Sequence, residues 1–513
     1  MIFKGHALSK EQLTALHLFT KLEHNDTLVI DAGAGSSKTF TCNAIATQLC
    51  SSLNVLVLAF NSIIVEEMKD AFPDNVLVST THAFARGKTR PYPERKLKTP
   101  LVPRYVADAL ELPSKVLGID ALHFAAKIIK AISDYCVSDI DKLSDYIASN
   151  SHKYLGSNEQ DAVELLINQG KRLWQMMTDR QSQCPVTHDV YLKEFVLLVK
   201  SGSIKLDFDV VILDEAQDTT PIVKQFVEIL NAKKIAVGDK YQSIYEWRNA
   251  VNVMEDYMSK GNTTTRLTTC YRFGESIANI SNSLIEKYYG TNPNFKGNVK
   301  KNSQIHTSAN HEQHDSSLLL FRTNAELMAT LVDKVEKGEA CCMLKDQKES
   351  LMLIDDAQKL YNGQRVTRGI LSVFANWHEF EQYTKNGNGS ELRTFQKTVE
   401  MYGFDKVRSI IKATANMPIE RAKYVFATAH STKGIEFKHV VIGADFDQYI
   451  QRSSGRYLLQ EINLLYVALT RAVESLDVSQ CSTLVQLVRK PAMQTLATST
   501  MAKKRQAVLA MFG

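Results

Sequence analysis

The sequence lacks any pair of cysteines spaced as C-x-x-C, although it contains eight cysteines. This absence argues against a zinc site or a disulfide framework and fits a reducing compartment such as the cytosol. No apolar run approaches the roughly 20 residues that a membrane-spanning helix needs. Residues 1–12 lack the basic segment and apolar stretch of a secretory signal. We therefore expect no membrane segment and a cytoplasmic location.

A strong charge imbalance is also absent, because the formal net charge of the 513 residues is only +5. A nearly neutral chain can still concentrate positive charge in one channel, so composition leaves nucleic-acid binding undecided. No segment repeats at a fixed period. Hydrophobic residues make up 44% and charged residues 23%, as in an ordinary globular protein. The length exceeds that of one ordinary core and predicts about three or four structural units.

Short apolar runs alternate with helical segments in two parts of the chain, which is typical of parallel sheets covered on both faces. The first part has a helix at about 38–50 and five strand candidates: Thr27–Ala32, Asn54–Phe60, Val76–Ser79, Phe208–Leu213 and Lys234–Val237. The second part has a helix beginning in Asn463–Ala472 and three strand candidates: Ser317–Phe321, Tyr424–Thr428 and His439–Gly443. The sequence therefore predicts an α/β protein with two parallel-sheet domains.

Two segments interrupt this rhythm and are predicted to be insertions. Residues 86–195 are mainly helical in pattern, and residues 345–419 lack strand candidates and include the loop-like run from Lys385 to Gly389. We expect a first domain from 1–85 and 196–262 with 86–195 inserted. We expect a second domain from 263–344 and 420–513 with 345–419 inserted.

A turn of small residues joins the first strand candidate to its helix. It consists of Gly33, Ala34, Gly35, Ser36 and Ser37, followed by Lys38 and Thr39. Small residues let consecutive backbone N–H groups surround a phosphate, and the helix N-terminus adds positive charge. Lys38 can then reach the terminal phosphates, and the Thr39 hydroxyl can bind Mg²⁺. Ser37 replaces the usual glycine, so its Cβ is expected to tighten or distort the loop. A tight strand–helix turn without a ligand is the alternative.

The fourth strand candidate delivers two carboxylates, Asp214 and Glu215, at its carboxyl end. This pattern suits a Mg²⁺–ATP site, in which Asp214 holds the metal and Glu215 orients or deprotonates the attacking water. An Asp-Glu pair after a strand can also be only a charge at a helix N-terminus. The phosphate loop upstream favours the ATP site.

Several motifs follow one another in a characteristic order. They are Leu8–Gln12, Ala32–Thr39, Leu56–Asn61, Thr80–Phe84, Asp214–Asp218, Val237–Arg248, Tyr271–Arg272, His430–Phe437 and Leu464–Ala472. In this order the chain resembles the superfamily 1A DNA helicases of the UvrD/Rep/PcrA type. Within them it is most similar to the F-box DNA helicases and their prokaryotic or viral relatives. The resemblance spans nearly the whole chain and implies two RecA-like P-loop domains.

By this resemblance, ATP and Mg²⁺ are the cofactors, and several residues outside the phosphate loop serve them. Gln12 is expected to read the adenine, although Ser9 and Gln12 also have the spacing of a helix capping box. Gln242 is expected to sense the γ-phosphate. Tyr271 would stack on adenine, Arg272 would bind the γ-phosphate and Glu436 would lie near the ribose. Arg471 would be an arginine finger, which typically raises the rate by about 10³–10⁵.

The resemblance also places a set of residues on single-stranded DNA: Phe60, Asn61, His82, Trp247, Arg248 and His430. Trp247 is expected to stack on a base, which contributes about 1–3 kcal/mol whatever the base. Phe60 and His82 could equally be core residues. Between Arg86 and Arg104 the chain has seven basic residues, four prolines and Tyr92. We expect this stretch to be extended and to contact phosphates, with a solvated charge run as the alternative.

These features predict an ATP-dependent DNA helicase that moves along single-stranded DNA, 3′-to-5′ by resemblance, in DNA replication, repair or recombination. ATP would lie between the two α/β domains, whose closing and opening move the strand. The expected partners are single-stranded DNA and junctions with duplex, with replication or recombination proteins as further partners. We expect a monomer, in the cytoplasm or nucleoid, or in the nucleus of a eukaryote.

Three other functions stay open. One is a translocase that strips proteins from single-stranded DNA, and another is a non-hydrolysing nucleic-acid-binding scaffold, which Ser37 alone favours. A helicase–nuclease is disfavoured because only about 40 residues follow the last motif, without an acidic cluster. The second insertion has about 75 residues, fewer than UvrD-like enzymes usually carry there. We therefore expect unwinding without removal of this segment.

Overall fold

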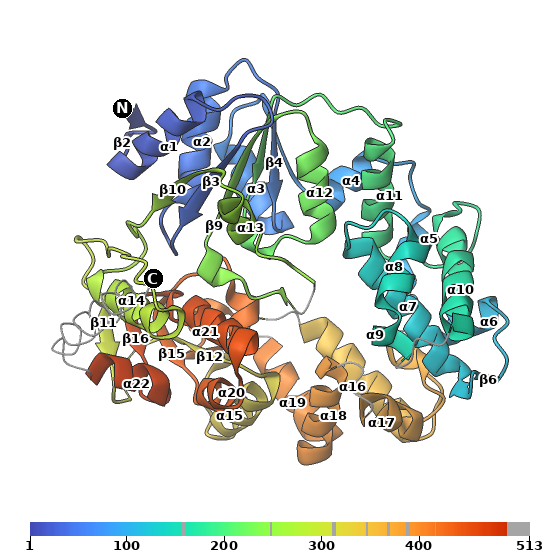
Figure 1. The fold of residues 1–513 in the computed structure, drawn as a ribbon. Helices are drawn as coiled ribbons and strands as arrows, with labels where there is room; N and C mark the ends of the chain where they lie inside the picture. Colours follow the sequence, from blue (N-terminus) through green and yellow to red (C-terminus); the bar gives the residue numbers. More distant parts are fainter. Residues whose placement is uncertain are drawn as a thin grey trace, which may run out of the picture. The chain divides into compact units, whose positions relative to one another are not determined.

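The computed structural model describes residues 1–155, 160–246, 249–309, 314–344, 347–366, 370–385, 390–415 and 417–489. The chain divides into two compact units (Figure 1). The first unit contains Met1–Leu267 and Lys348–Arg408, and the second contains Thr268–Gln347 and Ser409–Gly513. Each unit is built around one parallel sheet of six strands, so the α/β class predicted from the sequence is confirmed.

The sheet of the first unit has the order β10-β3-β9-β8-β4-β5, and every neighbouring pair is parallel. Its strands are β3 (Thr27–Ala32), β4 (Val55–Ala59), β5 (Val76–Thr80), β8 (Val210–Leu213), β9 (Lys233–Gly238) and β10 (Thr263–Leu267). Five of the six match the strand candidates of the sequence within two residues. The exception is β10, whose three threonines and Arg266 give no apolar run.

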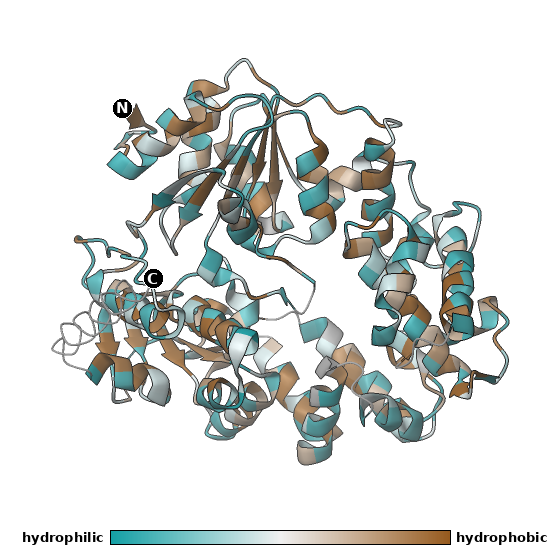
Figure 2. Ribbon diagram, viewed as in Figure 1, coloured by the Kyte–Doolittle hydropathy of each residue, from teal (hydrophilic) through white to brown (hydrophobic). Residues whose placement is uncertain are grey.

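Helices cover both faces of this sheet, which is why its central strands are mainly apolar (Figure 2). Alternate residues of β3 enter different cores, with Leu28 and Ile30 in one and Val29 in the other. The first core includes side chains of α1 (Lys10–Thr20), α2 (Lys38–Leu49) and α3 (Ser62–Ala71). The second core includes side chains of α12 (Pro221–Ile229) and α13 (Val253–Ser259).

Residues 86–195 are mainly helical, as the pattern predicted, and they extend the second core. The helices around this segment are α4 (Thr81–Lys88), α5 (Glu94–Lys98), α6 (Pro103–Ala109), α7 (Ala121–Val137), α8 (Leu143–Asn150), α9 (His152–Leu155), α10 (Gln160–Thr178) and α11 (His188–Lys200). Two hairpins of paired two-residue strands complete this unit: β1 (Ile2–Phe3) with β2 (His6–Ala7), and β6 (Lys115–Val116) with β7 (Ile119–Asp120).

The segment predicted as the second insertion is also helical. It contains α16 (Gln347–Tyr361), α17 (Trp377–Lys385), α18 (Ser390–Tyr402) and α19 (Phe404–Ala415). Residues of α16 to α18 form a small core of their own, and Val102 of the first helical segment packs against it. A longer-range ion pair joins Arg104 and Glu379 at 4.0 Å. These contacts explain why Lys348–Arg408 groups with the first unit, although the chain reaches it from the second sheet.

The sheet of the second unit has the order β11-β16-β15-β12-β14-β13 and is parallel throughout. Its strands are β11 (Gln304–His306), β12 (Ser317–Phe321), β13 (Cys341–Met343), β14 (Tyr424–Thr428), β15 (Phe437–Ile442) and β16 (Ala472–Asp477). The principal helices are α14 (Glu275–Tyr289), α15 (Asn324–Glu336), α20 (Asp445–Arg452), α21 (Gly455–Leu469) and α22 (Ser482–Arg489).

One helix predicted in this unit was placed wrongly. The sequence suggested a helix beginning in Asn463–Ala472, whereas α21 begins at Gly455 and ends at Leu469, and Ala472 is already the first residue of β16. The polar residues early in α21 hide its apolar face, and the charges of β16 hide a strand that is largely buried. The local sequence pattern therefore mispredicted this boundary, because β16 is defined by its pairing with β15.

The expectations about cysteine and membrane segments can be checked directly. All eight cysteines lie among the described residues, and every one is buried with a free thiol. Burial raises the pKa of the Cys184 thiol to about 11, so this sulfur is held protonated and unreactive. Among the helices that the structure describes, none is long and apolar enough to cross a bilayer.

Candidate nucleotide and DNA site

The phosphate loop runs from the end of β3 at Ala32 to the start of α2 at Lys38. Gly35 and Ser37 both have left-handed backbones, with φ of +67° and +64°. Ser37 thus adopts the conformation that a glycine would take, at a cost of about 1–2 kcal/mol for a residue with a Cβ. The Cβ of Ser37 is therefore accommodated by a left-handed backbone, which stores strain in the loop.

Ser36 gives an independent sign that this loop is built for an anion. The side chain is 2% exposed, and its Oγ has no hydrogen-bond partner in the described part of the chain. A buried hydroxyl without a partner is costly and needs an explanation. A phosphate oxygen held at the N-terminus of α2 would satisfy it.

Lys38 is paired with the second carboxylate of the site. Its Nζ lies 3.1 Å from Oε1 of Glu215, and both side chains are only 14% exposed. Glu215 follows the end of β8 and also has a left-handed backbone, with φ of +51°. Asp214, the proposed metal ligand, is 7% exposed beside it. The structure therefore brings the phosphate-loop lysine and the proposed water-orienting carboxylate together.

Gln217 links this carboxylate to the segment after β9. Its Nε2 donates to Oε2 of Glu215, and its Oε1 accepts from the backbone N–H of Asp239 at 3.1 Å. A Cβ on Gly238 would lie 2.1 Å from that Oε1, so only glycine permits the approach. The sequence motifs contained Gln217 and Asp239, but no role was predicted for either.

Gln242, the predicted γ-phosphate sensor, lies in the short 3₁₀ helix η2 (Lys240–Gln242). It is buried, and its Nε2 donates to Oδ2 of Asp239 at 3.0 Å. The other carboxylate oxygen of Asp239 accepts from the N–H of Tyr241 and caps the same turn. Gln242 is therefore oriented by Asp239, which in turn is connected through Gln217 to Glu215.

Gln12 forms the capping box that its spacing suggested. Its Oε1 accepts from the N–H of Ser9 at 2.9 Å, while the Ser9 hydroxyl accepts from the N–H of Gln12. Its Nε2 also donates to Oγ1 of Thr41 on α2 at 3.2 Å. Gln12 thus fixes the start of α1 against the helix that carries Lys38. Its role toward adenine stays a prediction.

In the second unit, Arg272 is held by two groups from distant parts of the chain. Its Nε donates to Oε1 of Glu436 at 2.6 Å, and its Nη1 donates to the carbonyl of Thr470 at 2.9 Å. Tyr271 beside it is 41% exposed and presents an open ring. Three residues predicted for the nucleotide therefore meet within this unit.

Arg471 follows the end of α21 and is 2% exposed, so it is no solvated surface arginine. Its guanidinium donates to the carbonyls of Val467 and Ile435 and to Oγ1 of Thr470. These bonds fix the position of the positive charge at the end of the helix. Its role as an arginine finger stays a prediction.

The residues predicted to bind DNA have different local partners. Phe60 is 37% exposed and stacks on Tyr245, with ring centroids 5.4 Å apart and an angle of 23°. Tyr245 lies in a predicted motif, but no role was assigned to it. Asn61 caps α3 by accepting from the N–H of Ile64 at 2.9 Å. Phe60 and Tyr245 form an aromatic platform at the end of β4.

The remaining DNA candidates are histidines and two residues without a described structure. His82 is the second residue of α4, and its Nε2 lies 3.0 Å from Oδ1 of Asp189, with both side chains partly exposed. His430 lies in the 3₁₀ helix η7 (Ala429–Thr432), directly after β14. Trp247 and Arg248 lie outside the described residues.

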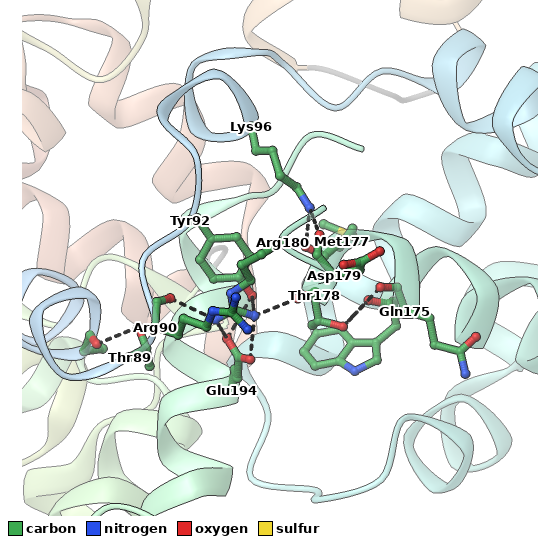
Figure 3. A network of polar contacts seen from close by, with 12 residues as sticks. Thr89, Arg90, Tyr92, Lys96, Gln175, Met177, Thr178, Asp179, Arg180 and Glu194 are labelled. Atoms are coloured by element: carbon green, nitrogen blue, oxygen red, sulfur yellow. Dashed lines mark hydrogen bonds and ion pairs between the residues drawn. The ribbon is translucent and has the colours of Figure 1, made fainter. Parts of the chain in front are cut away.

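The expectation of an extended, phosphate-binding stretch between Arg86 and Arg104 is wrong in part, because α5 and α6 lie within it. Figure 3 shows that Tyr92 and Lys96 point into a polar network inside the first unit. The ammonium of Lys96 is fully buried and donates to the carbonyls of Met177 and Asp179. Lys96 is buried and does not face solvent, because the carbonyls at the end of α10 need a hydrogen-bond donor.

The same network holds Tyr92 between charged groups. The guanidinium of Arg180 lies 3.7 Å from the centre of the Tyr92 ring and donates to both carboxylate oxygens of Glu194 at 2.7 Å. The Tyr92 hydroxyl donates to the same carboxylate at 2.8 Å. Burial and the neighbouring Glu194 raise the pKa of Tyr92 above its usual range. Tyr92 is therefore a structural residue rather than a base-stacking one.

The donors around the phosphate loop fit Mg²⁺ better than a metal held by protein ligands alone. Among the described residues, no group of three or more His, Cys, Asp or Glu side chains could hold a metal ion. Mg²⁺ usually binds one or two protein oxygens together with phosphates and water. Thr39, in the first turn of α2, and Asp214, at the end of β8, supply two such oxygens.

Comparison with known proteins points to one family. Residues 8–261 match the UvrD/REP helicase N-terminal domain. The chain is 27% identical over 492 residues to F-box DNA helicase protein 1 of Schizosaccharomyces pombe, an alignment that covers 89% of this chain and 56% of that protein. It is 25% identical over 520 residues to F-box DNA helicase 1 of Gallus gallus, covering 93% and 50%. The chain thus spans about half the length of these curated relatives.

Proposed function

The chain belongs to the UvrD-like helicases of superfamily 1A, and on that premise we propose that it is an ATP-dependent DNA helicase that moves along single-stranded DNA. The observation that carries the proposal is the pairing of Lys38 with Glu215 beside a strained phosphate loop. This pair joins the group that binds the terminal phosphates to the group that orients the attacking water. Both belong to the first unit.

Lys38 changes its counter-ion when ATP binds. Without phosphate, Glu215 neutralises the ammonium, and the γ-phosphate takes over that role in the complex. Glu215 is then available to orient or deprotonate a water molecule. Mg²⁺, when bound with ATP, would neutralise charge on the phosphates, and Thr39 and Asp214 are the residues that would hold it. Ser37 was the only feature favouring a non-hydrolysing scaffold, and its left-handed backbone supports an intact loop.

The second unit contributes two arginines in this proposal. Arg272 exchanges Glu436 for the γ-phosphate, and Arg471 stabilises the charge that develops on the transferred phosphoryl group. Both interactions exist only while ATP is bound, so binding closes the two units and phosphate release lets them open. Tyr271, with its exposed ring, stacks on the adenine, and Gln12 reads its edge.

Single-stranded DNA lies on the stacked pair of Phe60 and Tyr245, since an aromatic face accepts any base. His82 and His430 contact the strand beside it, and Trp247 provides a further stacking surface. The segment from Asp239 to Tyr245 connects this platform to Gln242 and so to the nucleotide. These few residues therefore transmit the loss of the γ-phosphate to the surface that holds the DNA.

The test is ATP hydrolysis with and without single-stranded DNA, followed by unwinding of duplexes with 3′ or 5′ tails. We expect DNA to stimulate hydrolysis and the 3′-tailed duplex to be unwound preferentially. Lys38→Ala serves as the control and should abolish both activities. Equal hydrolysis by the parent protein and this variant would refute the catalytic assignment. Unwinding of only the 5′-tailed duplex would refute the polarity and leave the helicase proposal standing.

The small helical segment within 348–408 leads to a further expectation. Because it has its own core and groups with the first unit, we propose that it supports unwinding instead of inhibiting it. The intact chain should therefore unwind DNA. A large gain in unwinding after deletion of residues 350–415 would contradict this.

A further inference from the structure

Asp31 is a buried carboxylate immediately before the phosphate loop. It is the fifth of the six residues of β3, its side chain is 8% exposed, and its backbone pairs with Arg266 on β10 and Gly238 on β9. A carboxylate at this position opposes the binding of a polyphosphate unless cations neutralise it. Its surroundings therefore indicate what it does.

Two cations from different elements meet at one oxygen of Asp31. Nε of Arg266 lies 3.3 Å from Oδ2, and Nζ of Lys240 lies 3.7 Å from the same atom. Arg266 lies on β10, at the edge of the sheet, and Lys240 begins η2, the turn that contains Gln242. Asp31 therefore connects the strand of the phosphate loop to β10 and to the segment that senses the γ-phosphate.

A backbone hydrogen bond reinforces one of these connections. The N–H of Gly33, the first glycine of the phosphate loop, donates to the carbonyl of Leu267 at 3.0 Å. Leu267 is the last residue of β10 and the last residue of the first unit before the chain enters the second at Thr268. The phosphate loop is thus tied to β10 by a main-chain bond to Leu267 and, one residue earlier on that strand, by the ion pair between Arg266 and Asp31.

We propose that Asp31 is a positioning residue that couples the occupancy of the phosphate loop to β10, the strand through which the chain leaves the first unit. The inference rests on the proposed binding of ATP at this loop. The incoming phosphates attract Lys240 and Arg266, and Asp31 opposes that attraction. When phosphates draw Arg266 away from Asp31, the end of β10 moves. The chain carries this movement into Thr268, the first residue of the second unit.

The proposal predicts changes of opposite sign in nucleotide affinity. Asp31→Asn keeps the shape of the side chain and removes a negative charge, so Mg²⁺–ATPγS should bind about two- to fivefold more tightly. Arg266→Gln removes a cation and should weaken binding by a similar factor. Lys260→Gln removes a lysine that pairs with Asp256 at the surface and should change nothing. A purely structural pair would give lower thermal stability and the same direction of change in both variants.

Hydrogen exchange of the amides in residues 263–270 gives the second measurement. In the parent protein, Mg²⁺–ATPγS should slow exchange in this segment. In Asp31→Asn, at saturating nucleotide, that protection should be lost while residues 33–42 are still protected. Equal protection of 263–270 in both proteins would overturn the coupling role and leave ATP binding intact. If the parent protein bound no nucleotide, the proposed function and this inference would both be wrong.

Discussion

The phosphate loop and the helical segment 86–195 of the first unit both contain buried lysine side chains. In the phosphate loop the lysine lies at the N-terminus of a helix, whereas in the helical segment the lysines bind the C-terminal ends of helices. Lys38 lies at the N-terminus of α2, where the helix dipole repels a cation. Lys96 and Lys193 donate to carbonyls at the ends of α10 and α7, where the dipole favours a cation. Lys38 has a carboxylate partner, Glu215, whereas the ammonium groups of the other two donate to backbone carbonyls.

We propose that this difference separates a lysine that binds a ligand from one that supports the fold. A carboxylate partner can be replaced by phosphate, because both are anions competing for one ammonium. A neutral backbone carbonyl at a helix end is fixed by the fold, so a lysine bonded to it keeps this partner. The identity of the partner, more than burial, therefore tells which lysine serves function.

The largest expected effect tests the ligand-binding side of the comparison. Lys38→Ala should lower DNA-stimulated ATP turnover by about 10²–10³-fold, because a charge that stabilises the transition state is lost. Its melting temperature should stay close to that of the parent, since a cation at a helix N-terminus adds little stability. Phosphate release and thermal unfolding measure the two quantities. A large fall in stability with turnover intact would reverse the comparison.

The next effect concerns the pH dependence of stability. Burial lowers the pKa of Lys193 from 10.5 to about 8, so between these values the unfolded chain binds more protons than the folded chain. The free energy of unfolding therefore rises with pH in this window, by up to about 1.4 kcal/mol per pH unit from this group. Lys193→Met should remove that rise, as measured by urea unfolding at pH 7.5 and pH 10.

The control for this measurement lies on the same helix. Lys200 is 41% exposed and pairs with Asp141 at the surface. Lys200 adds only the smallest contribution to the lowered pKa of Lys193, so Lys200→Met should change the pH dependence of unfolding far less than Lys193→Met does. The tyrosines and cysteines whose pKa values do not depend on Lys193 contribute equally to all three proteins and cancel in the comparison. If both variants changed the slope alike, burial of Lys193 would not be its cause.

Lys96→Met tests the fold-supporting side directly. It leaves buried carbonyls at the end of α10 without their donor and should reduce the free energy of unfolding by about 1–3 kcal/mol. Lys98→Met, on the same short helix but 77% exposed, should change it by less than about 0.5 kcal/mol. Urea unfolding measures both. Affinity for single-stranded DNA should fall no more for Lys96→Met than for Lys98→Met, unless Lys96 contacts phosphate after all.

The smallest effect concerns the strain in the phosphate loop. Ser37→Gly should relieve a left-handed backbone and raise the free energy of unfolding by about 1 kcal/mol. Ala34, in the same loop, is absent from the residues with positive φ, so Ala34→Gly should give no such gain. Thermal unfolding without nucleotide distinguishes them. Equal stabilisation by both changes would show that strain at Ser37 is not the cause.

Much of the fold could be predicted because parallel strands covered on both faces are apolar without interruption. β3 and β12 have the bounds that their sequences indicate. β10 escaped because an edge strand of three threonines and Arg266 has no apolar pattern. Its place beside β3 is fixed by pairing with a strand more than 200 residues earlier in the chain. Such pairings leave no local trace.

The candidate site was predictable in composition but only partly in geometry. The structure places Lys38, Glu215 and Gln242, which motif spacing assigned to one nucleotide site, in the segments that follow β3, β8 and β9 of the first sheet. It gave no indication that Gln217 joins two motifs, because that bond depends on the close approach allowed by Gly238. It also assigned Tyr92 and Lys96 to a DNA-contacting surface, since charge and aromaticity in a sequence do not reveal burial.

The sequence by itself determined that two parallel sheets and a phosphate loop are present, and it gave the resemblance to the UvrD-like helicases. Each of these features depends on contiguous residues, so its apolar runs, small side chains or charges can be recognised directly in the sequence. Only the tertiary structure decided which lysine faces a carboxylate and which faces carbonyls, and it alone placed Asp31 between Arg266 and Lys240. Electrostatic partners are chosen by distance in space, and the chain order of the residues does not encode that distance.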